Sequence, residues 1–483
     1  MSISSALLSA VSGLNATSRA ANVVSSNLAN VLTDGYAPRR LEQEAQGQGL
    51  PGVKITGIFR DVDPGILADR RIADAELAHA DTRAQFLTAV ERSIGTPDES
   101  TSLSARLAAF DAALVSASAT PENTALLQAA VLRAGDLTTG FEAASDKIQA
   151  LRTDADGQIE QAVGRINTLL GNIQSLNARI SNRGVPDQHM ATLQDQRQSL
   201  IDDLSGFIPL RQVPRGGGTV ALFTTGGAIV LDGAPATLDF TASNLVQPHM
   251  TLDNGLLSGL TINGVAVAPS GPGSPVDGGR LSALFSIRDD LAVDAQTQLD
   301  ATARDVIERF QQAGLDPTLA PGDPGLFTDG GAAFDPLNEV GLSGRLSVNA
   351  LVDPDQGGAL YRLRDGLGAS APGSAGDGTL LSQLAGALSA NRSLASGDLG
   401  AAARPASGHL ANLSSRLAQD RLTLDQARTF ASTLQAELAD LEAQQGVDSD
   451  AETQKLLLIE QAFAANARVI QTVDEMMQTL LRI

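Results

Sequence analysis

The stretch SSNLANVLTDGYAPRR, residues 25–40, lies where a long helical pattern stops and a turn begins. Upstream, apolar and small side chains recur alternately four and three residues apart: Ile3, Leu7, Ala10, Leu14, Thr17, Ala21, Val24, Leu28 and Val31. This heptad spacing predicts a helix with a single apolar seam. Asp34 and Gly35 then favour a turn, and Pro38 disfavours a new helix. No neighbouring segment can cover the seam, so the helix needs a distant partner.

The C-terminal stretch carries a matching seam. Its members keep the same alternation: Leu456, Ile459, Phe463, Asn466, Ile470, Val473, Met477 and Leu480. We therefore predict that residues 1–32 and 453–483 pair as a coiled-coil-like terminal module, because each seam can cover the other. The predicted assembly interface consists of the apolar seam residues: Ile3, Leu7, Leu14, Val24, Leu28, Val31, Leu456, Ile459, Phe463, Ile470, Val473, Met477 and Leu480. A bundle closed within one chain and assembly between chains both fit this pattern.

Between these ends the pattern is mainly helical. The expected helices cover residues 66–95, 102–118, 121–182, 189–205 and 280–312. We expect a break at Gly184 to Pro186, and a further heptad stripe from Leu410 to Leu441 predicts another long helix. By contrast, the β-favouring run Thr219 to Phe223 is followed by Thr-Thr-Gly-Gly and a second β-favouring run, which predicts a hairpin.

The predicted fold class is therefore multidomain and mainly α, with a long helical bundle, paired terminal helices and a small β-rich domain in the middle. The predicted divisions are residues 1–32 with 453–483 as the terminal module, 33–206 with 280–312 and 401–452 as the helical core, 207–279 as the β-rich insertion, and 313–400 as a loop-rich segment with short strands. Because the divisions are nested, both ends of the sequence belong to one module.

Composition excludes several classes of function. The formal net charge is -21, whereas a general nucleic-acid binder needs an excess of cations to neutralise phosphates. Only Lys54, Lys147 and Lys455 are lysines, so no polybasic segment can hold an anionic membrane. The absence of cysteine excludes disulfides, thiolate catalysis and Cys-ligated metals. The opening residues lack the basic start of a signal peptide, and we expect them to be part of the mature structure.

No constellation of residues indicates catalysis, a cofactor or a metal site. The four histidines have no second histidine at metal-ligand spacing: His79, His189, His249 and His409. Asp448 and Asp450 resemble part of a calcium loop, but the required glycine and distal glutamate are missing. We interpret Asp448 as the cap of the last helix, with Asp450 in its acidic first turn. We therefore expect no enzyme activity.

The opening segment SALLSAVSGLNATSRAANVVSSNLANVLTDGY resembles the N-terminal helix of the axial proteins of the bacterial flagellum. That family ends this helix on a motif similar to SNNIANVNTxGY. Asn27, Asn30, Gly35 and Tyr36 stand at matching positions, whereas Leu32 replaces the usual asparagine. Rod and hook proteins share this motif, so it identifies only the axial group.

Interior segments narrow the resemblance to the hook-filament junction family, hook-associated protein 1. LQDQRQSLIDDLSGFI is similar to its LDQRDxLIDELS-type signature, and GGRLSALFSIRDDLAVDAQTQLD is similar to its GGxLxGLLxxRD-type helix. The last helix, with Glu460-Gln461-Ala462-Phe463, resembles the family's Gln-Gln-Ala-Tyr region. The resemblance thins out over residues 207–279 and 313–400.

The resemblance implies a structural subunit that forms a ring with copies of itself between the hook protein and the next hook-associated protein. It also implies export of the unfolded chain through the flagellar type III apparatus, an extracellular location on the flagellum, and a cytosolic chaperone that covers the C-terminal helix before export. The alternatives are a hook or distal rod protein, a non-flagellar coiled-coil scaffold and a secreted enzyme.

Overall fold

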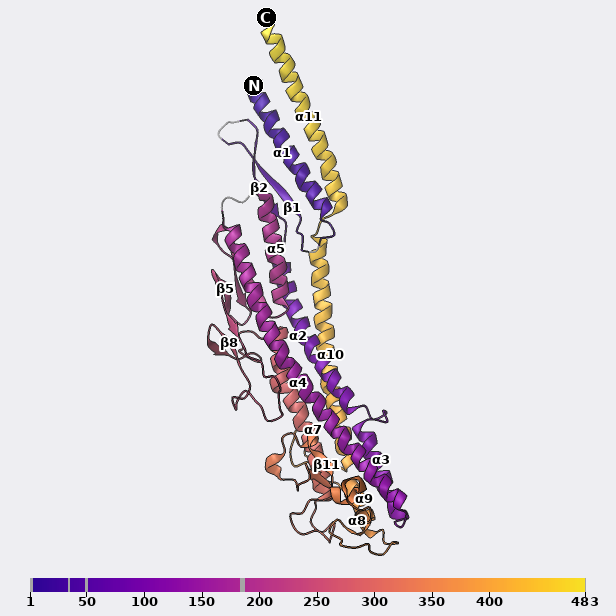
Figure 1. Ribbon diagram of the computed structural model, residues 1–483. Helices are drawn as coiled ribbons and strands as arrows, with labels where there is room; N and C mark the ends of the chain where they lie inside the picture. The colour runs from indigo at the N-terminus through magenta and orange to yellow at the C-terminus, as the bar shows by residue number, and fades with distance from the viewer. Residues whose placement is uncertain (1–2, 34, 48–50, 183–186, 483) are drawn as a thin grey trace.

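The computed structural model describes residues 3–33, 35–47, 51–182 and 187–482, and it is an elongated, mainly helical molecule with both termini at one end (Figure 1). The longer helices are α1 (Ile3–Ala29), α2 (Pro64–Ile94), α3 (Leu103–Ala119), α4 (Thr124–Ile180), α5 (Asp187–Ser205), α7 (Ala292–Phe310), α10 (Ala406–Gln444) and α11 (Ser449–Leu481). Shorter helices are α6 (Arg280–Ser286), α8 (Tyr361–Asp365) and α9 (Thr379–Ser389). The predicted fold class, mainly α with a β-rich insertion and packed terminal helices, is confirmed.

Side-chain caps explain where several helices begin. Asp63 accepts hydrogen bonds from the first N–H groups of α2, and Pro64 occupies the first helical position. Asn123 caps α4 in the same way. The interpretation of Asp448 is confirmed, because its carboxylate accepts from the backbone N–H groups of Asp450 and Ala451 at the start of α11.

The helix α4 forms the spine of the bundle and packs against α2, α3, α5, α6 and α7. Its predicted heptad stripe is buried: Ile159, Ala162, Ile166, Leu169, Ile173 and Ile180 are each 3% exposed or less. Towards the end far from the termini, Phe110, Phe310 and Phe327 form an aromatic cluster with ring centroids 5.1–5.9 Å apart. α10 returns along α2, so the chain comes back to the end where it started (Figure 1).

The β-rich insertion consists of two small antiparallel sheets on the flank of α4. The first has the order β3 (Leu210–Pro214), β4 (Val220–Thr224), β5 (Ile229–Asp232) and β6 (Ala234–Pro235). The second has the order β7 (Leu238–Asp239), β8 (Leu260–Ile262) and β9 (Val265–Val267). The predicted hairpin is confirmed as β4 and β5, and its turn closes through a hydrogen bond from the Thr224 N–H to the Ala228 carbonyl.

A buried ion network holds this insertion to the bundle. The Arg288 guanidinium, with a fully buried side chain, contacts Asp156 on α4 at 2.7 Å and Asp289 at 2.8 Å. The other carboxylate oxygen of Asp156 accepts a hydrogen bond from the Ser243 N–H in the insertion. Burial of these charges is tolerated because each one has a partner of opposite sign.

Arg152 extends the network to a neighbouring loop. Its guanidinium donates to the carbonyls of Arg288, Gln247 and Met250 at 2.6, 3.1 and 2.6 Å. Three carbonyls from two separate segments therefore converge on one side chain of α4. The loop between β7 and β8 is held against the bundle by polar contacts that a shift of α4 would break.

The loop-rich segment also contains short strands. β10 (Phe327–Asp329) pairs antiparallel with β11 (Leu346–Val348), so short strands lie in this segment as the sequence led us to expect. Arg309 at the end of α7 is buried, contacts Asp305 at 2.7 Å and donates to the carbonyls of Ala387 in the last turn of α9 and of Ala390 just after it. The segment is thus tied to the bundle at its far end.

One expected helix needs correction, one hairpin was not expected, and one expected break lies outside the described residues. The helix expected over residues 280–312 is interrupted by one π-helical turn, Ile287–Leu291. This turn contains Arg288, which forms the buried ion pair with Asp156. An antiparallel hairpin, β1 (Arg39–Ala45) with β2 (Val53–Arg60), was not predicted. The break expected at residues 184–186 lies outside the described residues. In the described part of the chain, no helix has both the length and the apolarity needed to cross a bilayer.

The buried network predicts a large loss of stability when one partner is removed. Asp156→Ala leaves the buried Arg288 charge without its α4 partner, and breaking a buried pair in this way costs about 3–5 kcal/mol. We expect the urea midpoint of unfolding to fall accordingly. Asp203→Ala is the matched control, because its pair with Arg165 is half exposed and such pairs contribute about 0–1 kcal/mol. Equal midpoints for the two variants would contradict this account.

Candidate assembly site

The helices α1 and α11 lie side by side and approach closely through small side chains (Figure 1). A Cβ added at Gly13 would lie only 2.7 Å from the Asn466 side-chain nitrogen, so a larger residue at position 13 would displace the Asn466 side chain. Ala10 and Ala16 on α1 are 2% and 5% exposed. The polar seam position Asn466 therefore faces the smallest residue available. This contact explains why an asparagine interrupts the apolar seam.

The predicted interface residues are only partly covered by this pairing. Val24 and Val473 are buried. The half-buried members are Ile3, Leu14, Leu28, Leu456, Ile459 and Ile470. The exposed members are Leu7 (39%), Val31 (43%), Phe463 (48%), Met477 (47%) and Leu480 (58%). Sequence reasoning did not select further exposed residues that flank the seams: Leu8 (58%), Leu457 (55%), Leu458 (64%) and Leu481 (83%). The α1–α11 pair thus presents an uncovered apolar surface.

Asn27 explains the motif at the end of α1. The residue is 1% exposed. Its side-chain amide pairs with the backbone N–H and carbonyl of Arg39, as a neighbouring β-strand would. The amide oxygen accepts from the Arg39 N–H at 3.0 Å and from the Tyr36 hydroxyl at 2.9 Å, while the amide nitrogen donates to the Arg39 carbonyl at 3.0 Å. One asparagine therefore satisfies three groups of the chain that leaves the helix.

The seam pattern extended the first helix to residue 32, but α1 ends at Ala29. The Asn30 side chain donates to the Ser26 carbonyl at 2.8 Å, and such local side-chain bonds compete with helix continuation. Val31 consequently lies beyond the helix. Gly35 has φ 73°, a left-handed conformation that favours glycine, and the Tyr36 N–H donates to the Thr33 carbonyl. Asp34, the other expected turn residue, lies outside the described residues.

The unpredicted hairpin connects the terminal pair to the helical bundle. Its strands carry Arg39 and Arg60, which contact the same carboxylate, Asp195 on α5, at 3.1 and 2.6 Å. At the hairpin's other end, the Ser12 hydroxyl on α1 accepts a hydrogen bond from the Val53 N–H. The alternation of Val53, Ile55 and later apolar residues in VKITGIFR was the available strand signal. The hairpin thus bridges α1 and α5.

A second ionic joint connects α2, α5 and α10. Arg70 on α2 contacts Asp74 at 2.6 Å and Asp202 at 2.8 Å, and it also pairs with Glu442 on α10. Burial alone would lower the pKa of the Arg70 guanidinium, but the three surrounding carboxylates raise it above its ordinary value. Arg71, which is 2% exposed, shares Asp202 at 2.6 Å.

The signature LQDQRQSLIDDLSGFI can now be understood residue by residue. Asp195 holds the hairpin, Gln198 accepts from Arg71 at 2.5 Å, and Asp202 serves the arginines of α2. Arg197 donates to Asn177 on α4 and to the Gly218 carbonyl, both at 2.8 Å. Burial, with a smaller contribution from nearby arginines, lowers the pKa of Arg197 to about 10, so it stays charged at neutral pH. The helix α5 is a connector between the terminal pair, the bundle and the insertion.

A cavity of about 520 Å³ lies at this joint, where the chain passes between the terminal pair and the bundle twice. Its lining includes Tyr36, Arg60, Asp63, Glu442 and Gly446. In the part of the chain that the structure describes, no group of three or more histidine or acidic side chains is placed to hold a metal ion. The ionic joints connect and orient the helices. The exposed apolar surface of the α1–α11 pair suits association with other chains.

Three known families match parts of the sequence. Residues 87–325 match the helical domain of flagellar hook-associated protein FlgK. Residues 443–483 match the C-terminal family of the flagellar basal body rod FlgEFG proteins, and residues 7–36 match the flagella basal body rod protein family. The two rod matches cover the ends that pair in the structure, whereas the FlgK match covers the helical bundle and the insertion.

Curated relatives agree with these families. Flagellar hook-associated protein 1 of Salmonella typhimurium is 29% identical over 289 residues, which cover 53% of this chain and 51% of the relative. The Escherichia coli protein of the same name is 26% identical over 290 residues, covering 53% and 52%. The Bacillus subtilis protein is 23% identical over 513 residues, covering 97% and 96%. The chain spans about half the length of the first two relatives in these alignments.

A solved structure of the flagellar hook junction protein FlgK from Burkholderia pseudomallei has a TM-score of 0.44 to this chain and 22% sequence identity, and the match covers 55% of this chain and 47% of that one. The FlgK helical-domain match spans the bundle built on α4 and the ion network of Arg288, and relatives named hook-associated protein 1 align with the same chain. Residues 87–325 of this chain therefore form a helical domain of the flagellar hook-associated protein FlgK type, and the chain as a whole is similar to proteins named flagellar hook-associated protein 1.

Proposed function

We propose that this chain is a structural subunit of the bacterial flagellum that forms the junction between the hook and the filament. The observation that carries the proposal is the α1–α11 pair, whose outer surface exposes leucine, phenylalanine and methionine side chains. Such a surface is costly in water and is favoured at interfaces between chains. The role is structural, and we expect no catalytic turnover.

Assembly proceeds, in this proposal, through the uncovered apolar side chains of the terminal pair. Full burial of one leucine or phenylalanine side chain contributes about 1.5–3 kcal/mol, so several of them per subunit supply a substantial driving force. The neighbours are copies of the same chain in a ring, the hook protein on one side and the next hook-associated protein on the other. Leu458, Phe463 and Leu480 are among the exposed residues available to them, at 64%, 48% and 58% exposed.

The motif residues have a separate role in this proposal. Asn27, Asn30, Gly35 and Tyr36 fix the direction in which the chain leaves α1 and thereby orient the terminal pair on the bundle. The hydrogen bonds of Asn27 to Arg39 and Tyr36 support this role. The apolar surface then faces neighbouring subunits in a defined orientation.

The division into domains follows the same reasoning. We propose residues 1–32 with 453–483 as the terminal module, 33–206 with 280–312 and 401–452 as the helical core, 207–279 as the insertion, and 313–400 as the loop-rich segment. The continuous buried apolar cluster from Phe86 to Leu417 supports the first boundary, because it includes no residue of the terminal module. The hairpin β1–β2 lies between the two parts and contacts both.

Export and chaperone binding complete the proposal. Passage through a narrow channel requires an unfolded chain, and a chain without cysteine cannot be trapped by disulfides. Among the described residues of α11, only Glu452 and Val473 are buried, so a cytosolic chaperone that covers residues 453–483 would prevent association before export. The terminal residues then become fully ordered on assembly, with neighbouring subunits providing the missing contacts.

A hook or distal rod protein is the second candidate, because the families that match residues 7–36 and 443–483 are rod families. The match of residues 87–325 to the FlgK helical domain favours the junction instead.

Deletion of the gene in the native bacterium separates these functions. We expect intact hooks, no filaments, and flagellin released into the medium, because filament subunits would lack their attachment site. Electron microscopy and detection of flagellin in the culture supernatant are the measurements. Absence of hooks would indicate a hook or rod protein, and normal filaments would exclude both.

Charged substitutions on the exposed surface of α11 separate assembly from folding. Leu458→Asp and Phe463→Asp should change the free energy of unfolding of the purified monomer by less than about 1 kcal/mol, because these side chains are largely exposed. The same variants should abolish filament formation when they replace the native chain. Leu132→Asp, at a 59% exposed leucine of α4, is the matched control and should leave filaments intact. Filaments in all three strains would contradict the proposed interface.

Limited proteolysis tests the terminal module and its motif. In the purified chain, both ends should be cleaved before the bundle, because α11 buries so few of its side chains. Asn27→Ala leaves the polar groups of Arg39 without partners, a cost of about 1–3 kcal/mol, and should accelerate cleavage between residues 30 and 60. Asn15→Ala, at an exposed position of α1, is the control. Equal protection of the ends and the bundle, or equal cleavage of both variants, would contradict the proposal.

A further inference from the structure

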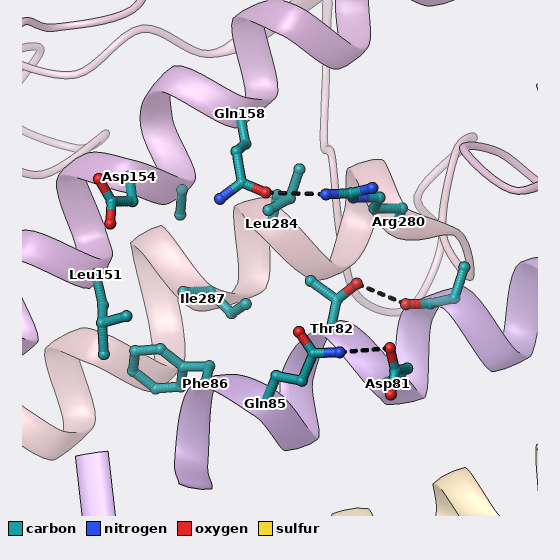
Figure 2. A pocket seen from close by; sticks show the side chains of 12 residues that line it. Asp81, Thr82, Gln85, Phe86, Leu151, Asp154, Gln158, Arg280, Leu284 and Ile287 are labelled. Atoms are coloured by element: carbon teal, nitrogen blue, oxygen red, sulfur yellow. Dashed lines mark hydrogen bonds between the residues drawn. The ribbon is translucent and has the colours of Figure 1, made fainter. Parts of the chain in front are cut away.

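A groove of about 480 Å³ lies on the bundle between α2, α4 and α6 (Figure 2). Its floor is apolar and is formed by Phe86, Leu151, Leu284 and Ile287, of which all but Leu151 are buried. The rim is polar. This combination of an apolar floor and a polar rim is the usual form of a pocket that receives one anchoring side chain from another protein.

The two ends of the groove differ in charge and polarity. Leu151 and Phe86 lie at one end, and Arg280 lies towards the other with Gln158 beside it (Figure 2). Arg280 donates to the Gln158 side-chain oxygen at 3.1 Å, and in the described part of the chain it forms no ion pair. The groove therefore offers an apolar site at Leu151 and, beside Gln158 seven residues further along α4, the cation of Arg280 on α6, which has no ion-pair partner among the described residues.

The helix α10 carries an anchoring side chain that the monomer leaves uncovered. Phe430 is 71% exposed although it lies in the middle of a long helix, and Leu422 on the same helix is 47% exposed. Glu437 follows Phe430 by seven residues, which places both side chains on one face of the helix. Within the described residues, Glu437 forms no ion pair and is exposed. α10 thus presents an aromatic residue and an anion at a fixed spacing.

Phe430 lies at nearly the same height along the subunit as the groove, but on a different flank. Arg428 on α10 points towards the groove, because it contacts Asp81 on the groove's rim at 2.8 Å. Residues two apart on a helix point about 200° apart, so Phe430 faces the other flank of α10. That flank borders α7, where Thr423 and Leu424 of α10 line a different cavity with Arg83 of α2.

We propose that Phe430 of one subunit docks into the α2–α4–α6 groove of a second copy of this chain, with Glu437 pairing with the second copy's Arg280. A projection on one flank that fits a recess on the other flank generates a head-to-tail contact, which closes into a ring when the rotation allows it. This inference rests on the proposed function, since it requires copies that stand side by side.

The spacing of the two contacts supports this docking. Seven helical residues span about 10.5 Å, and this distance separates Phe430 from Glu437 as well as Leu151 from Gln158, the partner of Arg280. In a ring all copies have the same orientation, and α4 and α10 run in the same direction in each copy (Figure 1). Phe430 at the Leu151 end therefore brings Glu437 to the Arg280 end. Phe86 on the floor offers an aromatic partner for the docked ring.

The proposal can be tested by cross-linking, because the native chain has no cysteine. A full-length double variant, Phe430→Cys with Gln85→Cys, places one thiol on the projecting flank and one on the groove. Mild oxidation of isolated flagella should give a ladder of covalent multimers of this chain, whereas the purified monomer should give none. Ala436→Cys with Gln85→Cys is the matched control, because Ala436 lies on a different flank of α10, and it should not cross-link.

A charge exchange provides the second measurement and does not depend on the cysteines. Arg280→Glu or Glu437→Arg alone should reduce the number of filaments per cell several-fold, since like charges then face each other. The double variant restores opposite charges and should return the number towards that of the native strain. Thermal unfolding of each purified variant should be unchanged, because both side chains are exposed in the monomer.

The outcomes separate this contact from the junction function. A multimer ladder together with rescue by the double charge variant supports the docking. Normal filaments without a ladder, or charge variants that act independently, would overturn the docking and leave the junction function intact. If deletion of the gene leaves filaments in place, the junction function fails and the docking fails with it.

Discussion

The pairing of α1 with α11 constrains the path of the whole chain. The two helices pack along each other, with Gly13 facing the Asn466 side chain. Because their sequences lie more than four hundred residues apart, everything between them has to leave one end of the molecule and return to it. The helix α2 leads away from that end, and α10, which packs along α2, leads back to it (Figure 1).

Two kinds of interaction hold this path together. The bundle is closed by apolar burial along α4, and its continuous core stops short of the terminal pair. The connection between the two is ionic instead: Asp195 receives two arginines of the hairpin, and Asp202 receives Arg70 and Arg71 of α2. Charged joints specify an orientation through geometry, whereas an apolar joint would allow sliding. The helix α5 supplies both carboxylates and thereby sets how the terminal pair stands on the bundle.

The exposed surface likewise has two separate apolar regions. Apolar side chains remain uncovered on α11 and, as a single large projection, at Phe430 on α10. The ring contact proposed through Phe430 would act between bundles, at a distance from the contacts proposed for the terminal pairs. Two separated contacts between the same subunits would resist bending better than either one alone.

Heptad spacing alone predicted α1, α4, α10 and α11, and the run after Thr219 predicted β4 and β5, because these elements bury one face whose period is visible in the chain. The hairpin β1–β2 escaped prediction because its stability comes from Asp195 and Ser12, residues distant in sequence. The end of α1 was placed too late because the competing bond of Asn30 leaves no trace in the apolar pattern. What the sequence by itself determined is therefore the periodic elements and the motif at Asn27. The exposure of individual seam residues, the connection made by α5 and the exposure of Phe430 could be seen only in the folded molecule, because they depend on side chains brought together from distant positions.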